Sequence, residues 1–164
     1  MEKLLVPLKE KHKAFLKPAP SVGDVSGGVL SSRERALFCL KDSRAVGAWA
    51  EDTAAEFLRS QGLKILARNV RGRYYELDLV CRDARELVIV EVRCRRGGHI
   101  MSAIETLGPQ KWRALARGAE MYVAEKAWTG DWRIDLVAVD VSDGRWSLNW
   151  LKYLEMDGGR RDGS

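Results

Sequence analysis

Two neighbouring apolar segments, YELDLVC and LVIVEVRC, carry carboxylates among residues that a folded chain would bury, and the chemistry of this protein starts with them. Side chains of a strand alternate between its two faces. Glu76 and Asp78 therefore share one face of the first segment, and Glu91 and Arg93 share one face of the second. Carboxylate oxygens are the ligands that Mg²⁺ and Mn²⁺ prefer in proteins.

The loop between the two segments decides whether their charged faces coincide. Directly opposed residues of an antiparallel pair point to the same side, so a loop with an even number of residues brings the faces together. A two-residue loop at positions 84 and 85 puts Asp78 directly opposite Glu91. Ala-Arg is a poor sequence for such a tight turn, so we expect a loop of four residues or a bulge.

Two carboxylates that face each other across a hairpin repel, and burial strengthens the repulsion. Arg93 offsets part of this charge, and a divalent ion would offset it fully. Mg²⁺ suits a site that has few carboxylates, keeps several waters and meets a phosphate. The alternative interpretation is a network of charges on a solvent-exposed sheet face, without a metal.

Basic residues surround these carboxylates in the sequence. From Lys64 to Arg96 there are nine Lys or Arg against five Asp or Glu, and eight of the nine are Arg. The planar guanidinium group matches phosphate oxygens, and a cationic rim around a metal-binding acid cluster suits a phosphodiester substrate. We therefore expect nucleic-acid contacts from Arg71, Arg73, Arg95 and Arg96.

Helices and further strands must position these residues. Apolar residues at helical spacing predict a helix at 46–61 and a second at about 110–125, which starts at a Gly-Pro pair. Strands are predicted at 63–68, in the two segments above, in WRIDLVAVDV and in WSLNWLKYL. The order α-β-β-β-α-β-β predicts an α/β fold in which helices flank a mixed sheet.

The predicted helices add two candidates. Glu51 lies beside the apolar positions of the first helix and could lean toward the sheet, although a solvated helix residue is an equal alternative. Lys111 lies near the start of the second helix and could reach a phosphate, against the alternative of an ordinary surface lysine. We expect Trp112 in the core rather than stacked on a base.

Composition excludes other kinds of site. The only histidines are His12 and His99, so a multi-histidine metal centre is excluded. Three cysteines without a CxxC pair indicate neither a disulfide framework nor a zinc knuckle, and the absence of a phosphate-binding glycine loop argues against a nucleotide cofactor. The net charge of +5 favours a polyanionic partner. No segment resembles a signal peptide or a membrane span, so we expect a cytoplasmic protein without a membrane partner.

The 164 residues divide into three predicted parts. Residues 1–41 combine scattered lysines with PAPSVGDVSGG, which predicts a disordered basic extension. Residues 42–155 contain all the predicted helices and strands and form one domain. Residues 156–164 are predicted to be a flexible tail. The sequence leaves the oligomeric state open, a dimer included.

Five blocks of the sequence, in order, resemble the YraN-like family of uncharacterised bacterial proteins: GAWAEDTAAEFLRSQGLKIL, YELDLV, VIVEVRCRR, QKWRALARGAEMYV and WRIDLVAVD. That family is similar in pattern to restriction-endonuclease-like nucleases, including archaeal Holliday-junction resolvases, which carry a helix Glu, a strand Asp and Glu-x-Lys on the next strand. The resemblance implies that Glu51, Asp78, Glu91 and Arg93 are catalytic. It also implies that Asp78 and Glu91 hold Mg²⁺ or Mn²⁺, with the Val92 carbonyl as a further ligand.

Two positions depart from the nuclease pattern. Arg93 replaces its lysine, although arginine also occurs there among YraN-like proteins, and Tyr75 replaces a glycine usual before Glu-x-Asp. The resemblance implies a restriction-endonuclease-like α/β domain that cleaves DNA, branched or otherwise structured, with a divalent metal. One alternative is a non-catalytic nucleic-acid-binding module that retains the nuclease fold. Another is a domain that serves only in protein assembly.

Overall fold

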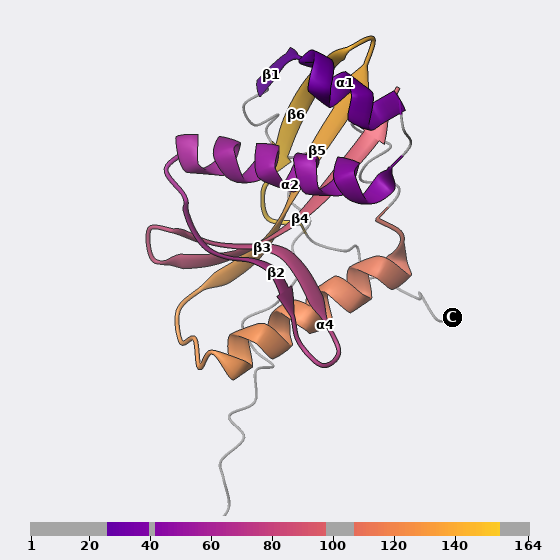
Figure 1. Cartoon of the computed structure of the whole chain (residues 1–164). Coiled ribbons are helices and arrows are strands. Elements are labelled where there is room, and N and C mark those ends of the chain that lie inside the picture. The colour runs from indigo at the N-terminus through magenta and orange to yellow at the C-terminus, as the bar shows by residue number, and fades with distance from the viewer. Residues whose placement is uncertain (1–25, 40–41, 98–106, 155–164) are drawn as a thin grey trace, which may run out of the picture.

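The computed structural model describes residues 26–39, 42–97 and 107–154. Within these residues, three helices and six strands form a mixed α/β domain (Figure 1). In chain order the elements are β1 (Ser26–Val29), α1 (Ser32–Cys39), α2 (Ser43–Ser60), β2 (Lys64–Arg71), β3 (Glu76–Asp83), β4 (Glu86–Arg96), α4 (Pro109–Glu125), β5 (Trp132–Ser142) and β6 (Arg145–Leu151).

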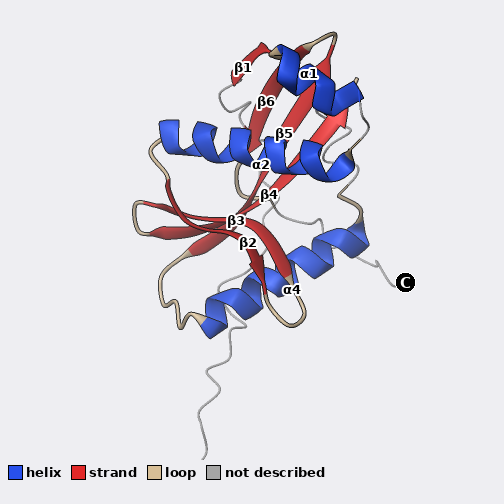
Figure 2. Cartoon of the chain, viewed as in Figure 1, coloured by secondary structure: helices blue, strands red, loops and turns tan. Residues whose placement is uncertain are grey.

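The six strands form one sheet in the order β1-β6-β5-β4-β3-β2, and only the pair β4 and β5 is parallel. Parallel neighbours need a long connection, and α4 lies in the segment that links these two strands (Figure 2). The predicted α/β class with a mixed sheet is confirmed. The arrangement is consistent with a restriction-endonuclease-like fold.

Helices α2 and α4 cover opposite faces of the sheet. Val88 and Val90 of β4 pack in the apolar cluster that contains α2, whereas the alternate residues Leu87 and Ile89 pack in the cluster that contains α4. This division follows from the two-residue period of a strand. Strand β4 is therefore covered on both sides, which explains its nearly continuous apolar sequence.

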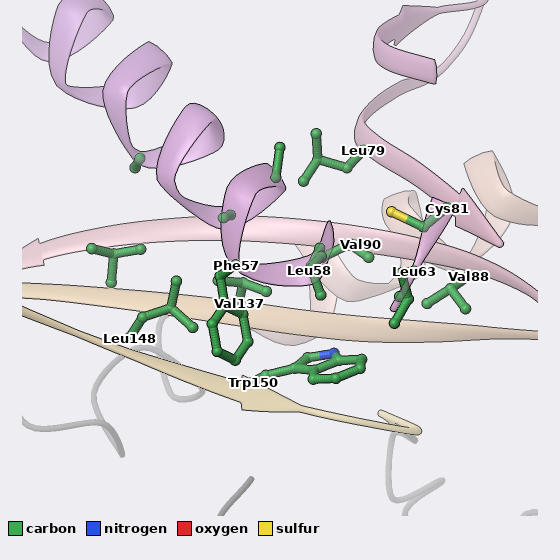
Figure 3. Close-up of a cluster of buried hydrophobic side chains, with 14 residues drawn as sticks. Phe57, Leu58, Leu63, Leu79, Cys81, Val88, Val90, Val137, Leu148 and Trp150 are labelled. Carbon is green, nitrogen blue, oxygen red and sulfur yellow. The ribbon is translucent and has the colours of Figure 1, made fainter. Parts of the chain in front are cut away.

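Helix α2 forms where the hydrophobic spacing predicts it. The Asp42 carboxylate caps its start by accepting hydrogen bonds of 3.0 and 3.1 Å from amides of the first turn, and Gly62 follows its end at a φ of 89°. Phe57 and Leu58 reach the sheet, where the Phe57 ring meets Trp150 edge-on (Figure 3). Burying a side chain such as Leu58 contributes about 2 kcal/mol.

The hairpin between β3 and β4 corrects one prediction. Its loop contains only Ala84 and Arg85, with Asp83 opposite Glu86, so the expected four-residue loop or bulge is wrong. Ala84 adopts a φ of 51°, which is unfavourable for an L-residue. A distant cation offsets this cost, because the Arg133 guanidinium pairs with both Asp83 and Glu86.

The predicted extension at 1–41 is wrong where it covers 26–39, because β1 and α1 lie there. Strand β1 pairs with β6, and α1 begins with a capping box. The Ser31 amide donates to the Glu34 carboxylate, the Glu34 amide donates to the Ser31 hydroxyl, and the Trp49 indole N–H also donates to Glu34. The S-x-x-E pattern in the sequence is a signal for this helix start.

The predicted tail at 156–164 and the first 25 residues of the predicted extension lie outside the described residues. In the part of the chain that the structure describes, no helix has the length and apolar character needed to cross a bilayer.

Candidate active site

A cavity of about 250 Å³ gathers the residues singled out in the sequence. Its wall takes side chains from α2 and α4 and from the two charged strands. It includes Glu51 of α2, Glu76 and Asp78 of β3, Glu91 and Arg93 of β4, and Lys111 of α4. The expected shared face of the two strands is therefore present, since the even-numbered loop brings their charged residues together.

The β3–β4 ladder ends at this cavity. Leu79 and Val90 are the last paired residues on this side, and the same register places Asp78 opposite Glu91. Beyond that pair, Asp78 Oδ2 accepts a hydrogen bond of 2.8 Å from the backbone N–H of Val92. The carboxylate thus pairs with a backbone donor of β4 at the point where the strands separate, which fixes it beside Glu91.

Glu91 is the most buried carboxylate of the cavity, with 3% of its surface exposed. Its Oε1 lies 3.0 Å from Arg93 Nη2 and 3.5 Å from Lys111 Nζ. Its Oε2 is buried and has no hydrogen-bond partner among the described residues. A buried charged oxygen without a partner is costly, so this atom is suited to bind a cation that enters the cavity.

The pKa shifts of the carboxyl groups also indicate that the negative charge of the cavity is poorly compensated. Burial raises the pKa of Asp78, although the Val92 hydrogen bond and the nearby cations oppose this shift. Burial and then the charge of Asp78 raise the pKa of Glu91. Burial also raises the pKa of Glu51, with Asp78 adding to the shift. The three groups therefore hold more negative charge near neutral pH than the site can easily accommodate.

Two carboxylates can act as metal ligands here. No group of three or more His, Cys, Asp or Glu side chains comes together as a metal site within residues 26–39, 42–97 and 107–154. Asp78 and Glu91 nevertheless meet the needs of Mg²⁺, which commonly binds one or two carboxylates and keeps waters or substrate phosphates as its other ligands. The unpartnered Oε2 of Glu91 supports this donor set.

The structure separates the other predicted basic residues into two groups. Arg71 pairs with Glu76 at 3.1 Å, and Arg73 stacks over Tyr74 at 5.0 Å, both at the β2–β3 connection. Arg95 and Arg96 are exposed at the end of β4. Of the predicted nucleic-acid contacts, only Lys111 lines the cavity itself.

The β2–β3 connection also contains an aromatic residue that sequence reasoning missed. Tyr74 is 70% exposed, and the tip that carries it is tightly packed. A Cβ on Gly72 would lie 2.3 Å from the Tyr75 ring, and a Cβ on Gly118 of α4 would lie 2.8 Å from Tyr75 Cβ. Tyr75 is thus held against α4, where its hydroxyl donates to Glu125 at 2.5 Å. An adjacent Arg-Tyr pair in a loop between strands was the available signal.

Tyr75 and Trp112 can be compared with their expected positions. Tyr75 replaces the glycine of the nuclease pattern, but its ring packs edge-on against Tyr122, 6.5 Å between centroids, and it does not line the cavity. Trp112 is partly buried and packs against the apolar cluster beneath α4, which agrees with the expectation that it belongs to the core. The cavity wall is therefore formed mainly by charged and small residues.

A second charged cluster, which the sequence did not suggest, lies at the opposite end of β4. Asp135 is fully buried and accepts hydrogen bonds from Arg133 at 3.0 Å and from the Trp150 indole at 3.0 Å. The Tyr153 backbone N–H donates to the same carboxylate. Every charge in this cluster has a partner, so its role is to hold the hairpin and the C-terminal strand together.

Comparison with known proteins identifies the family. Residues 50–139 match the model of "Uncharacterised protein family UPF0102". The chain belongs to this family. The matched range contains Glu51, Asp78, Glu91 and Lys111, and it agrees with the YraN-like resemblance seen in the sequence.

Several bacterial proteins of this family are similar to the chain, and each match covers a larger share of the relative than of this chain. A UPF0102 protein of Herpetosiphon aurantiacus is 37% identical over 121 residues, which cover 71% of this chain and 98% of that one. One from Dichelobacter nodosus is 39% identical over 107 residues, 65% of this chain and 85% of the relative. One from Symbiobacterium thermophilum is 48% identical over 82 residues, 50% and 70% of the two chains.

Proposed function

We propose that this UPF0102 protein is a metal-dependent endonuclease that acts on branched or otherwise structured DNA. The observation that carries the proposal is the buried, unpartnered Oε2 of Glu91 in a cavity that it shares with Asp78. A buried carboxylate oxygen without a donor needs a cation, and a carboxylate pair beneath cationic side chains suits a phosphodiester.

The metal ligands in this proposal are Asp78 and Glu91, with Mg²⁺ or Mn²⁺ as the ion. When bound, the ion supplies Lewis-acid chemistry for phosphodiester hydrolysis. Asp78 is already held by the Val92 amide, so it loses little side-chain freedom when it becomes a ligand. Val92 also lines the cavity, and its carbonyl is the further ligand in this proposal. Glu51 faces the same cavity from α2 and would orient a water there.

Arg93 has an electrostatic role in this proposal. A guanidinium group stays protonated at any working pH, so it cannot remove a proton from water as a neutral lysine could. It can instead donate to a phosphate where negative charge builds. Its Nε is buried without a partner among the described residues, which leaves one strong donor for a ligand in the cavity.

DNA would contact the arginines outside the cavity. Phosphates of one DNA strand would bind at two places: the β2–β3 connection, with Arg71 and Arg73, and the end of β4, with Arg95 and Arg96. We expect Arg95→Ala with Arg96→Ala to weaken DNA binding and to reduce its salt dependence by a slope of about 2. A protein that starts at Ser26 keeps every described element, so it should retain most of the binding, which separates the arginines from the N-terminal lysines.

The alternative function is a nucleic-acid-binding module without catalysis. The replacement of the nuclease lysine by Arg93 favours it, and so does the small number of carboxylate ligands. In that case the basic surface would bind DNA with the same salt dependence, and no divalent ion would be needed. Cleavage therefore has to be tested separately from binding.

The deciding experiment combines ion binding and cleavage. Calorimetry should detect Mn²⁺ binding to the wild-type protein, with large losses in Asp78→Ala and Glu91→Gln. Nicking of a four-way junction with Mg²⁺ or Mn²⁺ should disappear in the same variants, with duplex and single-stranded DNA run in parallel. The matched control is Asp52→Asn. Asp52 is an exposed carboxylate of α2 that pairs with Arg68 and does not line the cavity.

Wild-type protein that binds Mn²⁺ and DNA but leaves every substrate intact would support the binding module. Equal Mn²⁺ affinity in the wild type and in Asp78→Ala would exclude the proposed metal site.

A further inference from the structure

Two cations converge on a single atom of Glu91. Its Oε1 lies 3.0 Å from Arg93 Nη2 and 3.5 Å from Lys111 Nζ, while Oε2 has no hydrogen-bond partner among the described residues. Because Glu91 is only 3% exposed, solvent contributes little to stabilising its charge. The protein therefore supplies the counter-charge from its own side chains, with both of these contacts at Oε1.

The two cations are held differently. Arg93 projects from the same strand as Glu91, its side chain is 27% exposed, and its Nε is buried. The Lys111 side chain is 48% exposed and makes the longer contact. A lysine has a flexible stem and a compact charge, whereas a guanidinium group is planar and fixed by several donors. Lys111 is thus the cation that can leave.

The position of Lys111 on its helix adds a second reason. It lies in the first turn of α4, which begins at Pro109 and contains no acidic residue in that turn. The N-terminus of a helix carries partial positive charge, which disfavours a lysine there. Gly108 provides no side-chain cap to offset this charge. The approach of Lys111 to the sheet is therefore favoured by Glu91 and opposed by its own helix.

We propose that Lys111 is a displaceable counter-ion of Glu91. In the metal-free protein its ammonium group pairs with Oε1. When Asp78 and Glu91 bind a divalent ion, repulsion between the two cations moves the ammonium group toward the open side of the cavity, where it binds a DNA phosphate. This inference rests on the proposed metal site and adds a coupling to it: ion binding makes one DNA-binding cation available.

The coupling makes opposite predictions for the two ligands. In a variant without the Lys111 ammonium group, a divalent ion no longer has to displace that positive charge from Glu91 in order to bind. Ion binding should then tighten about tenfold, as expected for loss of one unit charge at a few ångströms from a partly solvated site. DNA binding should lose the part of its affinity that depends on the ion. A residue that merely supports the fold would not shift the two affinities in opposite directions.

Calorimetric titration of Mn²⁺ into the full-length wild type, Lys111→Met and Lys126→Met measures the first effect. Lys126 is the matched control, since it ends the same helix and its ammonium group lies 5.6 Å over the Tyr122 ring, away from the cavity. We expect about tenfold tighter binding for Lys111→Met alone, with all three proteins folded at the titration temperature. The half-exposed position of Lys111 makes a folding defect a minor concern, and Lys111→Gln serves as a second variant.

Fluorescence anisotropy of a labelled four-way junction measures the second effect, with and without Ca²⁺ to prevent turnover. Ca²⁺ should strengthen junction binding by the wild type and Lys126→Met, and less so for Lys111→Met. If Lys111→Met binds Mn²⁺ like the wild type, or more weakly, the counter-ion inference is overturned and the proposed nuclease site stands. If the wild type binds no divalent ion, both fail.

Discussion

Asp78 accepts a hydrogen bond of 2.8 Å from the Val92 amide on the neighbouring strand, just where the two strands stop pairing. This bond holds one carboxylate beside the buried Glu91 before any cation is bound. Both groups are costly in the metal-free protein, since burial raises the pKa of each. Holding the two carboxylates together therefore costs stability, and this gives the first prediction.

The free energy of unfolding of the metal-free protein should increase as the pH falls, because protonation relieves the cost of the two buried carboxylates. A carboxyl group whose folded-state pKa is raised binds protons in the folded state first, so stability decreases as the pH rises from its ordinary pKa through the raised value. Asp78→Asn should weaken this dependence and stabilise the protein near neutral pH by about 1 kcal/mol, while its amide oxygen can still accept from Val92. Urea unfolding of both proteins in a chelator between pH 5 and 8 measures the difference. A steeper dependence in the variant would contradict the repulsion between Asp78 and Glu91.

Arg93 should affect both stability and chemistry. Arg93→Ala should lower the free energy of unfolding by about 1–2 kcal/mol, because Glu91 then keeps only the longer contact with Lys111. It should also abolish metal-dependent cleavage, whereas Arg93→Lys should keep much of it, since a lysine still brings a positive charge to the phosphate. Thermal unfolding and junction cleavage on the same three proteins provide the test. An Arg93→Ala protein that is destabilised but cleaves like the wild type would leave Arg93 with a structural role only.

Tyr74 should discriminate between DNA structures. Its ring is 70% exposed on a tightly packed hairpin tip, beside Arg73. Stacking of a base on an aromatic side chain contributes about 1–3 kcal/mol. Tyr74→Ala should therefore weaken binding to single-stranded or branched DNA by about tenfold or more, with little change for continuous duplex. Tyr74→Phe, which retains the ring, is the control, and its affinity should match the wild type. Equal losses on all substrates would argue against stacking.

Glu34 should stabilise the packing of α1 against α2. It closes the capping box of α1 and accepts from the Trp49 indole of α2 at 2.9 Å. Glu34→Ala should cost about 1 kcal/mol. The Ser31 and Trp49 hydrogen bonds lower the pKa of Glu34, so its contribution is present above the ordinary pKa of a glutamate and is lost as the pH falls through the lowered value. Denaturant unfolding at pH 7 and pH 3 measures both effects, and a Glu34→Ala cost that is unchanged at pH 3 would contradict this assignment.

Local sequence patterns determined a large part of this protein. The periodicity of apolar residues predicted helices α2 and α4, because one face of each helix must be buried, and the same reasoning gave strands β2 to β6. Strand alternation also predicted that Glu76 shares a face with Asp78 and that Glu91 shares a face with Arg93, and that an even loop would bring the two faces together, as they are in the cavity. These features depend on neighbours in the chain, so they can be inferred without the fold.

Only the tertiary structure shows the features that depend on residues far apart in the sequence, which are the β3–β4 loop and the Lys111–Glu91 contact. Ala84 and Arg85 are a poor tight turn by themselves, and the two-residue loop exists because Arg133, far along the chain, pairs with both ends of the hairpin. Likewise, no local pattern indicates that Lys111 approaches Glu91, because that contact depends on how α4 packs across the sheet. Such contacts follow from the packing of whole elements, which forms only when the chain has folded.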